Sequence, residues 1–130
     1  MLCVPGLPRV CSEQEVDCPG RRDDRPGGRA HCPAAHTLGA LGAPGDVLLA
    51  ITSGGAAPAL TAAVQAAQAK DMTVVALTGR DAGDLAAQLG ETDVHIAVPH
   101  ERAARVFEAH ALVLHCLCDA VDLQLLGEED

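Results

Sequence analysis

Three short apolar runs, each followed by a segment rich in helix-forming residues, constrain the fold of this chain more than any other sequence feature. The runs occupy residues 46–51, 73–78 and 94–98 and consist mostly of Val, Leu, Ile and Ala. Continuous runs of this length are typical of strands that are buried on both faces of a parallel sheet. Strands that alternate with helices predict an α/β unit in which helices cover such a sheet.

The segments between and after these runs predict the helices. An Ala-rich helix is expected over residues 59–70, with Pro58 suited to its first turn. A short helix over residues 81–89 ends at Gly90, and a long helix runs from residue 101 to about residue 126. The expected order is therefore β-α-β-α-β-α with short connections.

The first part of the chain has a different texture. Residues 1–40 carry most of the Pro and Arg, and the stretch 18–29 has neither helical nor strand periodicity. Such a segment buries too little apolar surface to offset the entropy lost on ordering. We therefore expect an irregular region over residues 1–40 and a partial α/β domain over residues 41–130.

The composition limits the core and the partners. The chain has no Trp, no Tyr and one Phe, so its core must be built from small aliphatic residues, and we expect a partner subunit to help bury it. The formal net charge of -9 argues against a nucleic-acid backbone or an anionic membrane as the main partner. No apolar stretch looks long and uninterrupted enough to span a membrane.

The cysteines and the amino terminus bear on location. None of the six cysteines stands in a C-x-x-C spacing, and the first ten residues lack the pattern of a signal peptide. We expect a cytoplasmic protein with reduced thiols.

A loop of small residues follows the first expected strand. Its sequence is Thr52-Ser53-Gly54-Gly55-Ala56-Ala57. The hydroxyls of Thr52 and Ser53 can donate to phosphate oxygens, and Gly54 and Gly55 allow backbone amides to approach them. The helix that follows directs its positive end at the same place. The alternative is a plain β-α turn made of small residues because space is tight. The loop matches neither a Walker loop nor a dinucleotide fingerprint.

Three blocks of sequence carry a resemblance to a known family. They are GDVLLAITSGGAAP from Gly45, DMTVVALTGRDAG from Asp71 and RVFEAHALVLHCLCD from Arg105. Together they resemble the phosphoheptose isomerases of the sugar isomerase (SIS) family, and equally their non-enzymatic relative, the replication-initiator-associating protein. The resemblance is collinear and covers roughly two thirds of the chain, from about residue 41 to the end.

The resemblance implies a fold and an activity. The fold is a flavodoxin-like three-layer α/β sandwich with a parallel sheet, here partial, and the assembly is a homotetramer with active sites between subunits. The activity is an aldose–ketose isomerisation of sedoheptulose 7-phosphate, a carbohydrate derivative, for the heptose of lipopolysaccharide. The ligand implied is a phosphosugar.

The phosphate loop carries over in part. The family loop usually reads Ser-Thr-Ser-Gly-Asn-Ser, so the resemblance assigns phosphate binding to Thr52, Ser53, Gly54 and Gly55. Side-chain donors are missing where Gly54 and the two alanines stand. Each lost hydrogen bond to a charged group is worth about 1.5–3 kcal/mol, so we expect weakened binding.

The resemblance makes His115 an acid/base group and a zinc ligand. A residue that titrates near neutrality suits the proton transfer between adjacent carbons of an enediol. The alternative is a structural histidine on a helix. Phe107 stands where the enzymes usually have a glutamine that contacts substrate and metal, and Phe cannot ligate zinc. Glu108 lies about 10 Å from His115 along the helix, which suits a solvent or intersubunit pair.

The upstream part departs from the family. Residues 1–44 hold neither the family's substrate loop nor its helix with a catalytic Glu, so the chain resembles a family member whose amino-terminal half is missing or altered, with a segment read in a shifted frame as one hypothesis. Three functions stay open. The chain is an isomerase with little or no turnover, a non-catalytic adaptor that binds the replication initiator, or a remnant that retains at most phosphosugar binding.

Overall fold

The computed structural model describes residues 10–13, 33–54 and 58–127. The Pro-, Gly- and Arg-rich stretch expected to be irregular lies outside the described residues, as does Gly55 of the expected phosphate loop. The expectations for these parts stay predictions.

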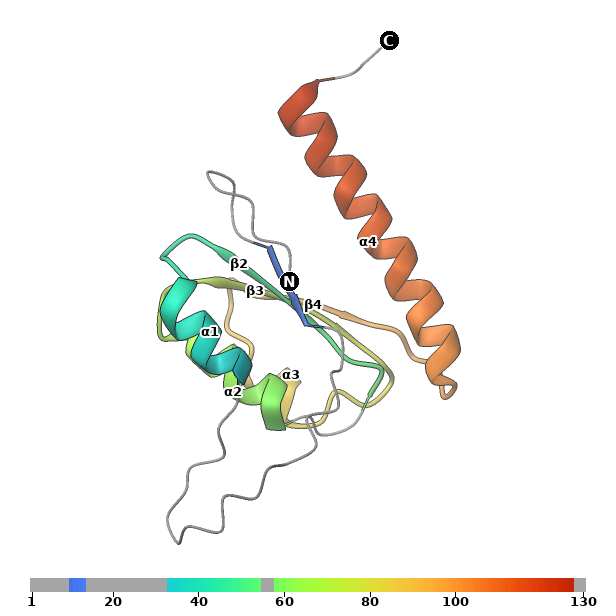
Figure 1. Cartoon of the computed structure of the whole chain (residues 1–130). Helices are drawn as coiled ribbons and strands as arrows, with labels where there is room; N and C mark the ends of the chain where they lie inside the picture. The colour runs from blue at the N-terminus through green and yellow to red at the C-terminus, as the bar shows by residue number, and fades with distance from the viewer. Residues whose placement is uncertain (1–9, 14–32, 55–57, 128–130) are drawn as a thin grey trace, which may run out of the picture.

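The described strands form one parallel sheet of four strands in the order β1-β2-β3-β4 (Figure 1). Their bounds are β1 Val10–Glu13, β2 Val47–Ile51, β3 Thr73–Thr78 and β4 Val94–Ala97. The prediction of a parallel α/β sheet is confirmed. The number of strands was underestimated, because β1 lies in the region expected to be irregular and pairs Val10 with Val47 of β2.

Four helices accompany the sheet in the described residues. They are α1 Pro33–Leu41, α2 Pro58–Gln68, α3 Asp84–Gln88 and α4 Ala103–Leu126. Figure 1 shows α1, α2 and α3 on one side of the sheet and α4 on the other. Helix α3 starts later than expected, after Gly83 with a φ of 51°, a backbone conformation that cannot belong to an α-helix.

Helix α1 corrects the expectation that residues 1–40 are irregular. It begins at Pro33, a residue favoured in the first turn, and buries Leu38 to 4% exposure in the core. The average composition of the first 40 residues concealed this short apolar segment at their end.

The main core lies between the sheet and α1, α2 and α3. It contains mostly small and branched side chains: Leu38, Leu48, Ala50, Leu60, Ala63, Val64, Ala67, Met72, Val74, Ala76 and Leu85. Val64, Ala67, Val74 and Ala76 are fully buried. Because the buried residues of α2 and of the strands are small or branched, the helix can approach the sheet closely.

The amino end of the sheet is held by one carboxylate. Asp93 accepts hydrogen bonds from the backbone N–H groups of Val74 and Gly90, both at 2.8 Å, and from the Gln68 side chain at 3.1 Å. Burial alone would raise the pKa of Asp93, but these hydrogen bonds outweigh it and hold the pKa below its usual value.

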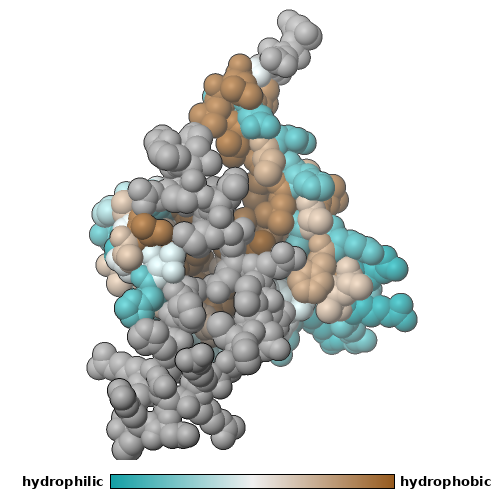
Figure 2. Space-filling model, in the orientation of Figure 1, coloured by the Kyte–Doolittle hydropathy of each residue, from teal (hydrophilic) through white to brown (hydrophobic). Residues whose placement is uncertain are grey.

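Helix α4 is the exception to this packing. Of its 24 residues only Val106 and His110 are buried. Large apolar side chains stay exposed on it: Phe107, Leu112, Leu117, Val121, Leu123, Leu125 and Leu126. Figure 2 shows a hydrophobic band that runs along the helix. We call this band the α4 surface.

By length and composition alone, α4 is able to cross a membrane. Its most apolar 18-residue stretch has a mean hydropathy of 1.4 and is 6% buried. The expectation that no stretch is long and apolar enough is therefore wrong on this criterion. A core helix of a soluble protein or a signal sequence meets the same criterion, so a single such helix is weak support for a membrane span.

Candidate functional site

The expected phosphate loop begins where β2 ends. The backbone N–H of Thr52 donates to the carbonyl of Leu77 at 2.9 Å, which extends the ladder one residue beyond β2. The Thr52 side chain is buried, and its hydroxyl donates to the Gly54 carbonyl at 3.3 Å while it accepts from the Gly54 N–H at 3.4 Å. Both distances are long for hydrogen bonds, so a phosphate oxygen competes with them readily. The Thr52 hydroxyl is thus bonded within the loop to which it belongs.

The neighbouring loop, which follows β3, supports this one from behind. A Cβ at Gly79 would lie 1.9 Å from the Ser53 carbonyl oxygen, so only glycine fits there. Gly54 has a φ of 147°, which also favours glycine, and a Cβ on it would meet only the Asp81 carbonyl at 3.7 Å. The two glycines therefore let the loops after β2 and β3 lie against each other.

Ser53 is the hydroxyl best placed for a ligand. Its side chain is half-buried, and among the described residues it makes no hydrogen bond. Helix α2 begins five residues later at Pro58, so the positive end of its dipole lies on the same side of the sheet. Proline at the first position was expected, and the structure confirms it. The loop can hold an anion through one hydroxyl, backbone N–H groups and a helix terminus.

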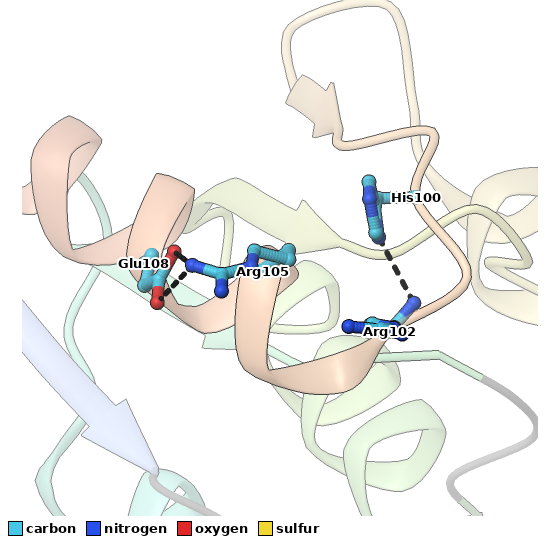
Figure 3. Close-up of polar contacts among 4 residues, drawn as sticks. All are labelled: His100, Arg102, Arg105 and Glu108. Atoms are coloured by element: carbon cyan, nitrogen blue, oxygen red, sulfur yellow. Dashed lines mark hydrogen bonds and ion pairs between the residues drawn. The ribbon is translucent and has the colours of Figure 1, made fainter.

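Basic side chains gather at the same edge of the sheet. Arg80 follows β3 and pairs with Glu101 at 2.5 Å, and both side chains are largely exposed. Arg105 bonds both carboxylate oxygens of Glu108, at 2.7 and 2.5 Å (Figure 3). Exposed pairs of this kind contribute about 0–1 kcal/mol each, but they cancel most of the local positive charge. Glu108 thus has an exposed partner on its own helix, where a solvent or intersubunit pair was expected.

The start of α4 is fixed by a local bond. The backbone N–H of Arg102 donates to Nδ1 of His100 at 3.0 Å, which Figure 3 shows beside the Arg105–Glu108 pair. Arg102 is the residue that precedes the first turn of α4, so the imidazole takes the place of a capping side chain.

His115, the expected acid/base group, lies exposed on α4. No hydrogen bond or ion pair that we describe joins it to the Thr52–Gly54 loop. Within the described residues no group of three His, Cys, Asp or Glu side chains is placed to hold a metal ion, and Phe107 offers no ligand atom. The described part of this chain therefore does not fit a zinc site by itself.

Sequence reasoning missed His110. It is 2% exposed, and its Nε2 lies 2.9 Å from the carbonyl oxygen of Thr78 at the end of β3. Its ring meets the edge of Phe107 at 6.4 Å between centroids and an angle of 82°. The four-residue spacing from Val106 to His110, which places both on one face of the helix, was the signal available.

Thr78 is approached by a second histidine. Its hydroxyl lies 2.9 Å from Nε2 of His95 and donates to the Gly79 carbonyl at 3.2 Å. Since Thr78 is fully buried, its hydroxyl stabilises the end of β3 and is not accessible as a nucleophile.

The comparisons with known proteins agree on one kind of relative. The chain is 66% identical over 96 residues to a phosphoheptose isomerase of Methylibium petroleiphilum, which covers 74% of this chain and 48% of the relative. It is 54% identical over 91 residues to a phosphoheptose isomerase of Aromatoleum aromaticum, and this match covers 70% of this chain and 46% of the relative. No family profile matches the chain.

Solved structures point the same way. A phosphoheptose isomerase from Neisseria gonorrhoeae superposes with a TM-score of 0.66 at 48% identity, over 68% of this chain and 49% of that one. A phosphoheptose isomerase from Francisella tularensis gives 0.66 at 39% identity, over 68% and 48%. The predicted α/β fold is thus confirmed as that of phosphoheptose isomerases. The chain spans about half the length of the relatives it matches.

Proposed function

We propose that this chain is a phosphoheptose isomerase-like protein of the SIS family that binds a phosphosugar of the sedoheptulose 7-phosphate class. The observation that carries the proposal is the 66% identity over 96 residues to a phosphoheptose isomerase. The loop that follows β2 supports it, because that loop lies beyond the carboxyl end of a parallel strand, where α/β proteins bind their ligands.

The chemistry assigned to the loop is phosphate binding. The Ser53 hydroxyl donates to one phosphate oxygen, the N–H groups at the start of α2 donate to others, and the helix dipole favours the negative charge. The Thr52 hydroxyl exchanges its long bond to Gly54 for one to the ligand. Gly55 belongs to the same assignment by its position in the sequence.

His115 is proposed as the acid/base group that moves a proton between adjacent carbons of the sugar. Among the described residues no hydrogen bond or ion pair joins it to a carboxylate, and a proton transfer of this kind needs a second group on the other side of the substrate. We therefore expect phosphosugar binding with little or no turnover by this chain alone.

A titration with sedoheptulose 7-phosphate tests the assignment. Amide chemical shifts of Ser53 and Gly54 should move with the phosphosugar and with inorganic phosphate, and should not move with unphosphorylated sedoheptulose. Replacing Ser53 by Ala should weaken binding by about tenfold or more, because a hydrogen bond to a charged group is lost. Thr92→Ala, which removes an exposed hydroxyl between α3 and β4, is the matched control. Equal affinity for the phosphorylated and plain sugar would contradict the proposal.

The proposal includes self-association. Large apolar side chains of a helix are normally buried, whereas α4 exposes Leu112 to 65% and Leu126 to 76%. A second copy of the chain is the partner that we propose for the α4 surface, with the homotetramer of the SIS family as the full assembly and the cytoplasm as its location. Sedimentation velocity should find oligomers, and Leu112→Asp should shift the population toward monomer.

A second candidate is a non-catalytic adaptor that binds the replication initiator. The α4 surface favours it, because exposed apolar bands of this extent are typical of protein–protein contacts. Capture of purified initiator by the wild-type chain, and its loss with Leu112→Asp, would support the adaptor. Phosphosugar binding without such capture would leave the isomerase assignment alone.

A further inference from the structure

Among the described residues, helix α4 has two fully buried side chains. Val106 and His110 are its buried residues, and the helix continues for 16 residues beyond His110 to Leu126 without another. Val106 makes an apolar contact, which has no preferred direction. His110 makes the directional contact, a hydrogen bond to the end of β3.

The bond fixes the state of the imidazole. The Thr78 carbonyl oxygen can only accept, so Nε2 of His110 must carry the proton that is donated over 2.9 Å. The same carbonyl also accepts from the backbone N–H of Val98 at 2.9 Å. Nδ1 of His110 is buried and has no hydrogen-bond partner among the described residues. The Nε2–H of His110 thus donates to the end of β3.

The end of β3 is next to the candidate phosphate loop. Gly79, the residue after Thr78, lies so close to the Ser53 carbonyl that no side chain fits between them. The carbonyl of Leu77, the residue before Thr78, accepts a hydrogen bond from the N–H of Thr52. A bond to the Thr78 carbonyl therefore acts on the backbone that supports Thr52 and Ser53 from behind.

We propose that His110 is a positioning residue of the phosphate site, one that ties α4 to the end of β3 and thereby sets the affinity of the Thr52–Ser53 loop for phosphate. It touches neither the ligand nor His115. It acts through Thr78 and Gly79 on the loop, and through the helix on His115, which follows it by five residues or about 7.5 Å. The inference rests on the proposed function, since it assigns the same site.

Phe107 belongs to this arrangement. It stands one turn before His110, and its ring edge packs on the imidazole at 6.4 Å between centroids. The contact keeps the imidazole in the rotamer that reaches Thr78. Phe107, which offers no atom to a substrate or metal, thus supports the loop indirectly, through His110.

Two variants separate a positioning role from a merely structural one. His110→Leu puts an apolar side chain of moderate size in place of the imidazole and removes the donor. His110→Gln keeps an N–H near the place of Nε2. Phosphate and sedoheptulose 7-phosphate affinities are measured on the folded protein from the amide shifts of Ser53 and Gly54. Gln124→Ala, exposed near the far end of α4, is the control.

We expect His110→Leu to weaken phosphate binding by about tenfold, from the loss of one hydrogen bond behind the loop, and His110→Gln to restore it to within about threefold of wild type. The control should bind like the wild type. Equal affinity for His110→Leu and wild type, or no recovery in His110→Gln, would overturn the inference.

A measurement on the wild-type chain covers the case in which His110→Leu does not fold. A scalar coupling between Nε2 of His110 and the carbonyl carbon of Thr78, with a slowly exchanging Nε2 proton, is expected, and its absence overturns the inference. Failure of the proposed function looks different: the wild type then gives no shift with either phosphate compound. The two failures are therefore distinguishable.

Discussion

Helices α2 and α4 are both apolar, yet they lie in opposite environments. In α2, with 11 residues, Leu60, Ala63, Val64 and Ala67 are buried against the sheet. In α4, with 24 residues, Val106 and His110 are the only buried ones. The large apolar side chain of α2 is thus covered within the described chain. Most large apolar side chains of α4 are not covered by the described sheet, and exposed apolar bands of this kind are typical of binding surfaces.

The largest expected effect tests the closed side of this comparison. Val64→Asp places an unpaired carboxylate in a fully buried position between α2 and the strands. A buried charge without a partner costs about 4–5 kcal/mol or more, a large part of the stability of a small domain. Urea unfolding followed by circular dichroism should find the variant unfolded or close to it. A melting curve like that of the wild type would mean that α2 does not pack as described.

A smaller loss is expected where the two loops meet. Gly79→Ala forces a Cβ to within 1.9 Å of the Ser53 carbonyl, so the backbone must shift. We expect a loss of about 1–3 kcal/mol, as for other overpacked sites, together with weaker phosphate binding. Gly90→Ala is the control, because a Cβ there meets only the Asp93 carboxylate at 3.5 Å. Similar losses in both variants would contradict the close approach of the loops.

The next effect depends on pH. Asp93→Asn replaces an acceptor of the Gly90 N–H by a donor, which should cost about 1–2 kcal/mol at pH 7. The pKa of Asp93 is lowered in the folded state, so its contribution is present above the unfolded value of 3.8 and is lost as the pH falls through the folded pKa. The stability difference between wild type and Asp93→Asn should therefore shrink below about pH 4. A difference that stays constant down to pH 2 would contradict the hydrogen-bonded carboxylate.

The smallest effect on folding is expected on the open side. Leu112 is 65% exposed, so Leu112→Asp should change the stability of the isolated chain by less than about 1 kcal/mol. The same substitution chemistry in α2 is expected to unfold the protein, and this contrast is the sharpest form of the comparison. A severe loss with Leu112→Asp, measured at concentrations where the chain is monomeric, would mean that α4 packs in the monomer.

The sequence predicted the regular elements from residue 46 onward because each is marked by its own local pattern. Strand β3 and the proline that opens α2 are examples. It missed β1 and α1, since a four-residue strand gains its stability from backbone pairing with β2 and leaves no periodic signal. It also placed α4 correctly without indicating that the helix would be exposed.

The site was predictable to a similar degree. The loop after β2 followed from the strand and from small residues at its end. The role of His110 did not follow, because its acceptor is a backbone carbonyl 32 residues away, and a carbonyl has no signature in the sequence. Ser53 and Thr52 looked equivalent in the sequence, whereas the structure engages the Thr52 hydroxyl within the loop.

The order of the strands has a consequence for how the chain reaches this fold. Every described strand pairs with the strand that precedes or follows it, Val47 beside Thr73 and Val75 beside Val94 among them. Parallel strands cannot be joined by a tight turn, so each pairing closes a longer stretch of chain, at an entropy cost that grows only slowly with its length. Such non-local pairing makes a parallel sheet slow to form. Because each strand pairs with its predecessor, the sheet can still grow one strand at a time in the direction of synthesis.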